Sequence, residues 1–118
     1  MISKSPLIRL DHILYEIDGL SDTIADMNFQ QFCSSYIGIR VVERGLEIIS
    51  EATRTLPDEL LASQPTIDWV RIRGIGNFLR HEYHRLDKQA LWDIARNKLP
   101  ELRDAIVSMR ATFVKTDL

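Results

Sequence analysis

The sequence predicts an all-α protein, a four- to five-helix up-and-down bundle. Apolar residues recur at three- and four-residue spacing along most of the chain, as in helices that bury one face. No stretch alternates apolar and polar residues over a useful strand length. The 5 glycines and 4 prolines are sparse and lie where helices could start or stop. A length of 118 residues suits one hydrophobic core, so we expect residues 1–118 to form a single helical domain.

The first half of the chain predicts two long helices and a short one. A helix from Pro6 carries a regular apolar stripe, made of Leu7, Leu10, Ile13, Leu14, Ile17, Leu20 and Ile24. Asn28 is a candidate cap for the next helix, which begins at Phe29 and runs on or restarts to about Leu56. Pro57 then opens a short helical turn.

The second half predicts two further helices. One starts at Pro65, with Thr66 as a candidate cap. Asp87 caps the last one, in which the apolar pattern continues past Pro100. Because proline cannot donate a backbone hydrogen bond inside a helix, we expect a break or kink near Leu99.

The charge balance limits how this chain could bind nucleic acid. It has 15 basic and 17 acidic residues, and its formal net charge is −2. Proteins that bind nucleic acid through bulk charge are usually basic. RNA binding would therefore require a local basic patch on a mildly acidic protein.

Several classes of protein are disfavoured by the sequence. Cys33 is the only cysteine, so no internal disulfide can form, and no Cys/His cluster has zinc-finger spacing. The N-terminus shows no signal-peptide pattern, and no apolar run approaches the ~18 residues of a membrane span. We expect a cytoplasmic protein with no membrane partner, no metal and no cofactor.

The segment 69–85 stands out because it holds four arginines, two histidines, an asparagine and a tyrosine. In a helix, one side would present Arg73, Asn77, Arg80 and His84, with His81 on the flank. The aliphatic residues gather on the opposite side. Gly76 lies on the Arg73 side, where a missing side chain lets a backbone or a ligand come close.

This combination of residue types suits phosphate chemistry. Arginine binds phosphate through a planar fork of donors, and histidine can move protons near neutral pH. A metal-free ribonuclease needs a base for the 2′-hydroxyl proton and a cation for the charge that builds on phosphate. The same pattern also fits a plain solvated helix face, which is the more common meaning of such polarity.

The segment 74–83, Gly-Ile-Gly-Asn-Phe-Leu-Arg-His-Glu-Tyr, resembles the signature of the HepT-like branch of the HEPN superfamily, which are small helical ribonuclease toxins. Other stretches resemble further landmarks of that family in the right order, from Leu7 to Phe113. These are segments 29–32 and 46–52, Trp69, and segments 91–94 and 99–102.

The resemblance implies a HEPN-like fold and an RNA-cleaving site where two protomers meet in a homodimer. It also implies a nucleotidyltransferase antitoxin as a partner. His81 matches the catalytic histidine, Asn77 matches the polar residue after the motif arginine, and Tyr83 matches the tyrosine that receives AMP in some members. The expected function is a metal-independent endoribonuclease toxin of a type II/VII-like toxin–antitoxin system, with RNA as its substrate.

The sequence departs from the family at the motif arginine, where Gly76 stands instead. We hypothesise that Arg73 or Arg80 supplies the missing cation, with Arg73 preferred because His81 follows it at two four-residue steps. Asn77 and His84 are the candidates for binding RNA phosphates. One alternative is a catalytically impaired HEPN-type module that binds a nucleotide or a protein, and another is a plain helical scaffold.

Overall fold

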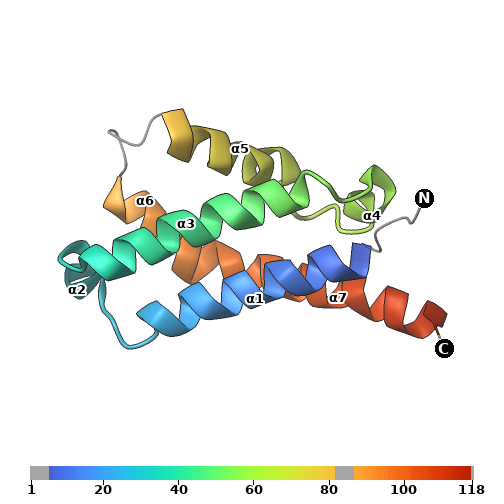
Figure 1. Cartoon of the computed structure of the whole chain (residues 1–118), viewed down its shortest axis with the longest axis horizontal. Coiled ribbons are helices and arrows are strands. Elements are labelled where there is room, and N and C mark those ends of the chain that lie inside the picture. Colours follow the sequence, from blue (N-terminus) through green and yellow to red (C-terminus); the bar gives the residue numbers. More distant parts are fainter. Residues whose placement is uncertain (1–5, 82–86, 118) are drawn as a thin grey trace.

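The computed structural model describes residues 6–81 and 87–117, with side chains for 6–79 and 87–113. Four long helical segments run alternately in opposite directions, so the predicted all-α up-and-down bundle is confirmed (Figure 1). The elements are α1 (Pro6–Ile24), α2 (Phe29–Cys33), α3 (Tyr36–Thr53), α4 (Asp58–Ala62), α5 (Trp69–His81), α6 (Lys88–Asp93), the π-helical turn η2 (Ile94–Lys98) and α7 (Leu99–Asp117).

Helix α1 lies between α3 and α7 and supplies the centre of the core (Figure 1). The predicted apolar stripe is buried at Leu10, Ile13, Ile17, Leu20 and Ile24. The backbone of α3 approaches α1 closely at Gly45, where an added Cβ would lie 2.5 Å from a methyl carbon of Leu20. Only glycine fits that approach without a shift of the Leu20 side chain.

The chain between α1 and α3 restarts instead of running on as one helix. The Asn28 side chain accepts from the Gln31 N–H at 2.8 Å, and the Gln31 side chain accepts from the Asn28 N–H at 2.9 Å. This capping box confirms Asn28 as the start of α2. Helix α3 then has a cap of its own, because the Ser35 hydroxyl accepts from the Gly38 N–H at 2.9 Å.

Helix α5 begins later than the sequence predicted, so the assignment of Thr66 as its cap was wrong. The carboxylate of Asp68 accepts from the Arg71 N–H at 3.1 Å, which makes Asp68 the cap. The indole N–H of Trp69 donates to the carbonyls of Leu61 (2.9 Å) and Gln64 (3.1 Å). These bonds hold the residues after α4 in a turn, and the helix starts only where the turn ends.

The last long segment contains the expected distortion near Leu99. Asp87 caps α6 as predicted, since its carboxylate accepts from the Gln89 N–H at 2.9 Å. Residues 94–98 form the π-helical turn η2, and α7 follows without a gap. Pro100 has no N–H to donate to the carbonyl four residues earlier, and the wider turn accommodates that loss.

An aromatic cluster closes one end of the bundle. Trp92 lies against Phe32, with ring centroids 5.1 Å apart, and against Phe29 at 6.2 Å. The cluster joins α2 to α6 and so fixes these two helices relative to one another. Among the described helices, none is long and apolar enough to cross a membrane.

Candidate functional site

The motif helix α5 packs mainly on α3, and its last turn carries two of the predicted site residues (Figure 1). Arg80 and His81 are helical there, while their side chains lie outside the described residues. Tyr83 and His84 also lie outside the described residues. The described geometry of the site is therefore that of α5 up to Leu79 and of the helices around it.

The predicted division of α5 into an aliphatic and a polar side is partly wrong. Ile72, Ile75 and Leu79 pack against the core as expected, and Asn77 is exposed. Gly76, however, is buried, and the Arg73 side chain is only 30% exposed. The buried face of α5 is therefore broader than the aliphatic stripe alone predicted, and Arg73 lies within the contact with α3.

Ser50 of α3 forms two hydrogen bonds with the backbone of α5 at this contact. Its hydroxyl is buried, donates to the Arg73 carbonyl at 3.0 Å and accepts from the Gly76 N–H at 3.0 Å. A hydroxyl carries both a donor and acceptor sites, so one side chain can serve both groups. Gly76 thus lies at a point of close helix contact, in agreement with the expectation that it lets a backbone come close.

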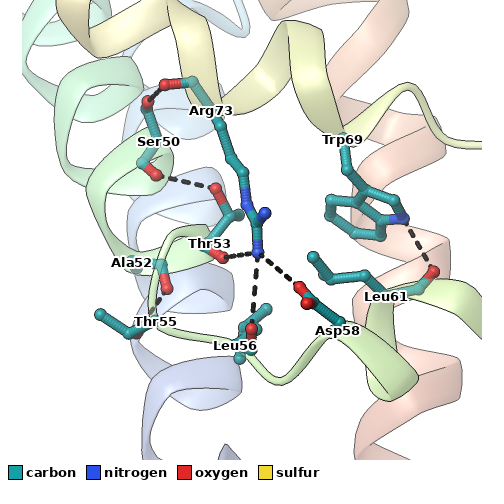
Figure 2. A network of polar contacts seen from close by, with 9 residues as sticks. All are labelled: Ser50, Ala52, Thr53, Thr55, Leu56, Asp58, Leu61, Trp69 and Arg73. Atoms are coloured by element: carbon teal, nitrogen blue, oxygen red, sulfur yellow. Dashed lines mark hydrogen bonds and ion pairs between the residues drawn. The ribbon is translucent and has the colours of Figure 1, made fainter.

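A second set of hydrogen bonds across this contact runs from the Arg73 side chain of α5 to the C-terminal end of α3 (Figure 2). Its guanidinium donates to the carbonyl of Thr53, at the end of α3, at 3.3 Å and to that of Leu56 at 3.5 Å. The exposed carboxylate of Asp58 lies 3.8 Å away. A cation is favourable at a helix C-terminus, where the last carbonyls have no helical partner.

This geometry separates Arg73 from the end of the helix where His81 lies. His81 follows Arg73 by eight positions, which is a rise of about 12 Å along the axis, and the guanidinium is bound at the end of α3. The Nε of Arg73 is buried with no hydrogen-bond partner among the described residues. Among the described residues, the hydrogen bonds of the guanidinium come from one terminal nitrogen, Nη2.

A groove of about 710 Å³ adjoins the last turn of α5. It is lined by α3, α5 and α6, through Tyr36, Ile39, Arg40, Glu43, Arg44, Glu47, Leu79, Lys88 and Leu91. We refer to it as the α3–α6 groove. Leu79 is its contribution from the motif helix, two residues before His81.

The α3–α6 groove combines cations with an aromatic ring. Arg40 and Arg44 pair with carboxylates of their own helix, Arg40 with Glu43 at 2.7 Å and Arg44 with Glu47 at 2.6 Å. The ring of Tyr36 is exposed and lies under the Arg40 guanidinium. The sequence analysis assigned no part in the site to these arginines, to Tyr36 or to Lys88. The four-residue spacing of Tyr36, Arg40 and Arg44 was the available signal.

A second hollow, of about 440 Å³, lies along the other flank of α5. Its walls are mostly apolar, with Ile72 and Ile75 of α5 facing Ile94 and Leu99 of the last helical segment. It adjoins the middle of α5, whereas the α3–α6 groove adjoins the end that carries Arg80 and His81.

Comparison with known proteins identifies the family of this chain. The model of the family described as Ribonuclease HepT-like matches residues 13–109, which is most of the sequence. The chain belongs to the Ribonuclease HepT-like family. The resemblance inferred from segment 74–83 and the other landmarks is therefore confirmed, and the structure of this HepT-like chain is all-helical.

Relatives in other organisms are similar over most of their length. A protein of Caldanaerobacter subterraneus named "Putative RNase" is 31% identical over 103 residues, covering 87% of this HepT-like chain and 92% of the relative. "Probable ribonuclease HepT" of Thermococcus cleftensis is 26% identical over 102 residues, covering 86% of this chain and 92% of the relative. No solved structure matches the chain.

Proposed function

We propose that this protein is a metal-independent endoribonuclease, with its active site around the last turn of α5. The observation that carries the proposal is the family match over residues 13–109, which contains the whole arginine–histidine segment. Relatives that cover most of the chain bear ribonuclease names.

In the proposed reaction, His81 accepts the proton of the RNA 2′-hydroxyl. The 2′-oxygen then attacks the adjacent phosphorus, the bond to the 5′-oxygen breaks, and a proton returns to that leaving oxygen. A guanidinium beside the phosphate stabilises the negative charge of the transition state. Asn77 and His84 bind RNA phosphates. No step of this mechanism requires a metal ion.

We assign the guanidinium to Arg80 in preference to Arg73. Arg80 is the neighbour of His81 in the last turn of α5, whereas the Arg73 guanidinium is bonded to carbonyls at the end of α3. Releasing Arg73 would leave those carbonyls without their cation. Arg73 remains the alternative, and the same experiment tests both residues.

The biological setting of the proposal is a toxin–antitoxin system of type II/VII-like organisation. The active site lies at a homodimer seam, and a nucleotidyltransferase antitoxin neutralises the toxin, with Tyr83 as the residue that receives AMP. The family resemblance supports this pairing, and co-purification of the antitoxin with the toxin is its direct test.

The first experiment measures cleavage of a mixed RNA pool by the purified protein in EDTA. We expect His81→Ala to lower the rate about 100-fold or more, because a positioned general base contributes about 10²–10⁴-fold. Arg80→Ala should lower it at least tenfold, and Arg73→Lys should leave most of it. The matched control is His12→Ala, an exposed histidine of α1.

A loss of cleavage in Arg73→Lys with full activity in Arg80→Ala would reverse the assignment of the cation. The absence of cleavage by folded wild-type protein would favour the second function, a binding module without catalysis. The burial of Gly76 where the family carries its arginine is the observation that favours that alternative.

A further inference from the structure

We propose that the α3–α6 groove binds the single-stranded RNA that flanks the cleaved bond, with Tyr36 stacking on a base and Arg40, Arg44 and Lys88 binding phosphates. This inference rests on the proposed ribonuclease function and extends it to the residues that hold the substrate. It is carried by the juxtaposition of an exposed ring, three cations and the end of the motif helix around one hollow.

Tyr36 has the geometry of a stacking platform. It is the first residue of α3 and is 72% exposed, even though the Arg40 guanidinium lies 4.8 Å from its ring centroid. One face of the ring is thus backed by a cation while the residue stays open to solvent. Bases stack on such aromatic rings with little regard to sequence.

Arg40 and Arg44 can transfer from their carboxylates to phosphates at small cost. Both side chains are mostly exposed, at 56% and 70%, and their ion pairs with Glu43 and Glu47 lie within one helix. Exposed pairs of this kind contribute little net stability. The two arginines follow one another by about 6 Å along the helix axis, a step comparable to that between successive phosphates of an extended strand.

Lys88 places a third cation on the opposite wall of the groove. It is the first residue of α6, and its ammonium donates to the carbonyl of Cys33, at the end of α2, at 3.1 Å. Among the described residues that line the groove, three are basic and two are acidic, on a protein whose net charge is −2. This is the local basic patch that RNA binding requires in an acidic protein.

The groove also leads to the site of the proposed chemistry. Leu79 forms part of its wall, and His81 lies two residues further along the same helix, a rise of about 3 Å. A volume of about 710 Å³ is within the range of sites that hold a small ligand such as a nucleotide. A strand bound here would place its next phosphate beside the last turn of α5.

The test measures binding of a short fluorescein-labelled single-stranded RNA by anisotropy, in EDTA and in the His81→Ala background so that no cleavage occurs. We expect Tyr36→Ala to weaken binding about tenfold, the effect of removing one stacking ring, and Tyr36→Phe to retain it. Tyr15→Ala is the matched control, because Tyr15 of α1 is 74% exposed and lies far from the groove.

The contribution of the charged side chains is tested with double variants, each compared with a matched double variant at another site. Arg40→Gln with Arg44→Gln should weaken binding about tenfold or more and flatten the dependence of log affinity on log salt by about 0.7 for each lost phosphate contact. The control is Arg103→Gln with Arg110→Gln, which removes the same charge from two arginines that also pair with carboxylates, Asp18 and Asp11. Glu43→Gln with Glu47→Gln should strengthen binding more than Asp11→Asn with Asp18→Asn.

Each result decides the proposal. Equal losses in the groove variants and in their controls would overturn it, even if the wild-type protein cleaves RNA. Selective losses in the groove variants would support it, even if the wild-type protein binds RNA without cleaving it. If the wild type neither binds nor cleaves RNA, both this inference and the proposed function fail. Selective capture of an acidic peptide by the groove, with no RNA binding, would also overturn it.

Discussion

The contact between α1 and α7 and the contact between α3 and α5 are built in opposite ways. The first buries aliphatic side chains such as Ile13, Ile17 and Ile106, and its polar bonds lie at the rim, where Asp18 and Asp11 pair with Arg103 and Arg110. The second places polar bonds within the contact itself, through Ser50 and Arg73.

The two contacts therefore have different roles: one mainly stabilises the fold, and the other mainly fixes the position of a helix. Apolar burial is non-directional and tolerates small slips of one helix along another. Hydrogen bonds between one hydroxyl and two defined backbone groups are satisfied in only one register. The α1–α7 contact thus stabilises the bundle mainly by apolar burial, while Ser50 fixes where the motif helix lies on α3.

The largest effect on stability should come from the apolar contact. Ile106→Ala should lower the free energy of unfolding by about 2–5 kcal/mol, because Ile106 is fully buried and its loss leaves a cavity. Urea denaturation measures the change, and Val107→Ala, at a neighbouring residue that is 41% exposed, is the control. Equal losses in the two variants would contradict the placement of the core.

An intermediate effect is expected at the polar contact. Ser50→Ala removes two cross-helix hydrogen bonds and should cost about 1–3 kcal/mol, at about 0.5–1.5 kcal/mol for each bond. Hydrogen exchange should then quicken selectively in α5, whereas in Ile106→Ala it should quicken across the bundle.

Thr53→Val is the matched control for Ser50→Ala. Thr53 is also buried, but its hydroxyl donates to the Ser50 carbonyl within α3. If exchange in α5 responded equally to both variants, Ser50 would have no special part in holding the motif helix.

The smallest effect on stability is expected for the ion pair between Arg103 and Asp18 at the rim of the α1–α7 contact, and this effect depends on pH. The Arg103 guanidinium donates to both carboxylate oxygens of Asp18, at 2.7 and 3.2 Å, and this bonding lowers the pKa of Asp18 below its ordinary value of 3.8. A lowered pKa in the folded state stabilises the fold above the unfolded pKa, and the gain is lost as pH falls through the folded value.

Asp18→Asn should therefore cost a few tenths of a kcal/mol at neutral pH, as is typical of exposed pairs. The difference from wild type should vanish in strongly acidic solution, below the lowered pKa. Urea denaturation across acidic to neutral pH checks this, with Asp26→Asn in the loop after α1 as the control. A cost that grew toward acidic pH would contradict the assigned direction of the pKa shift.

The helices themselves could be predicted because their signals are local. Apolar spacing predicted the buried stripe of α1, and the side chains of Asn28 and Asp87 marked the starts of α2 and α6. Pro100 predicted the distortion that the structure contains as a π-helical turn. Thr66 failed as a cap because the indole of Trp69 holds the preceding residues to the end of α4, a contact that no local pattern encodes.

The site could be predicted only in part. Segment 74–83 indicated the family, which the comparison confirmed, and the catalytic roles of His81, Arg80 and Arg73 stay predictions. The helical projection put Arg73 on an open polar face, whereas the structure puts its guanidinium against the end of α3. A projection treats α5 as an isolated cylinder and cannot see which neighbour supplies carbonyls.

The sequence by itself determined the helical class of this protein, the caps Asn28 and Asp87 and its membership of the Ribonuclease HepT-like family, because propensity, spacing and motif all reside in consecutive residues. Only the tertiary structure decided that Ser50 meets Gly76, that Arg73 caps α3, and that Tyr36, Arg40 and Lys88 share one groove. Those relations join residues far apart in the chain. They exist because burying the apolar faces brings particular backbone and side-chain groups together, and each buried polar group must then find a partner.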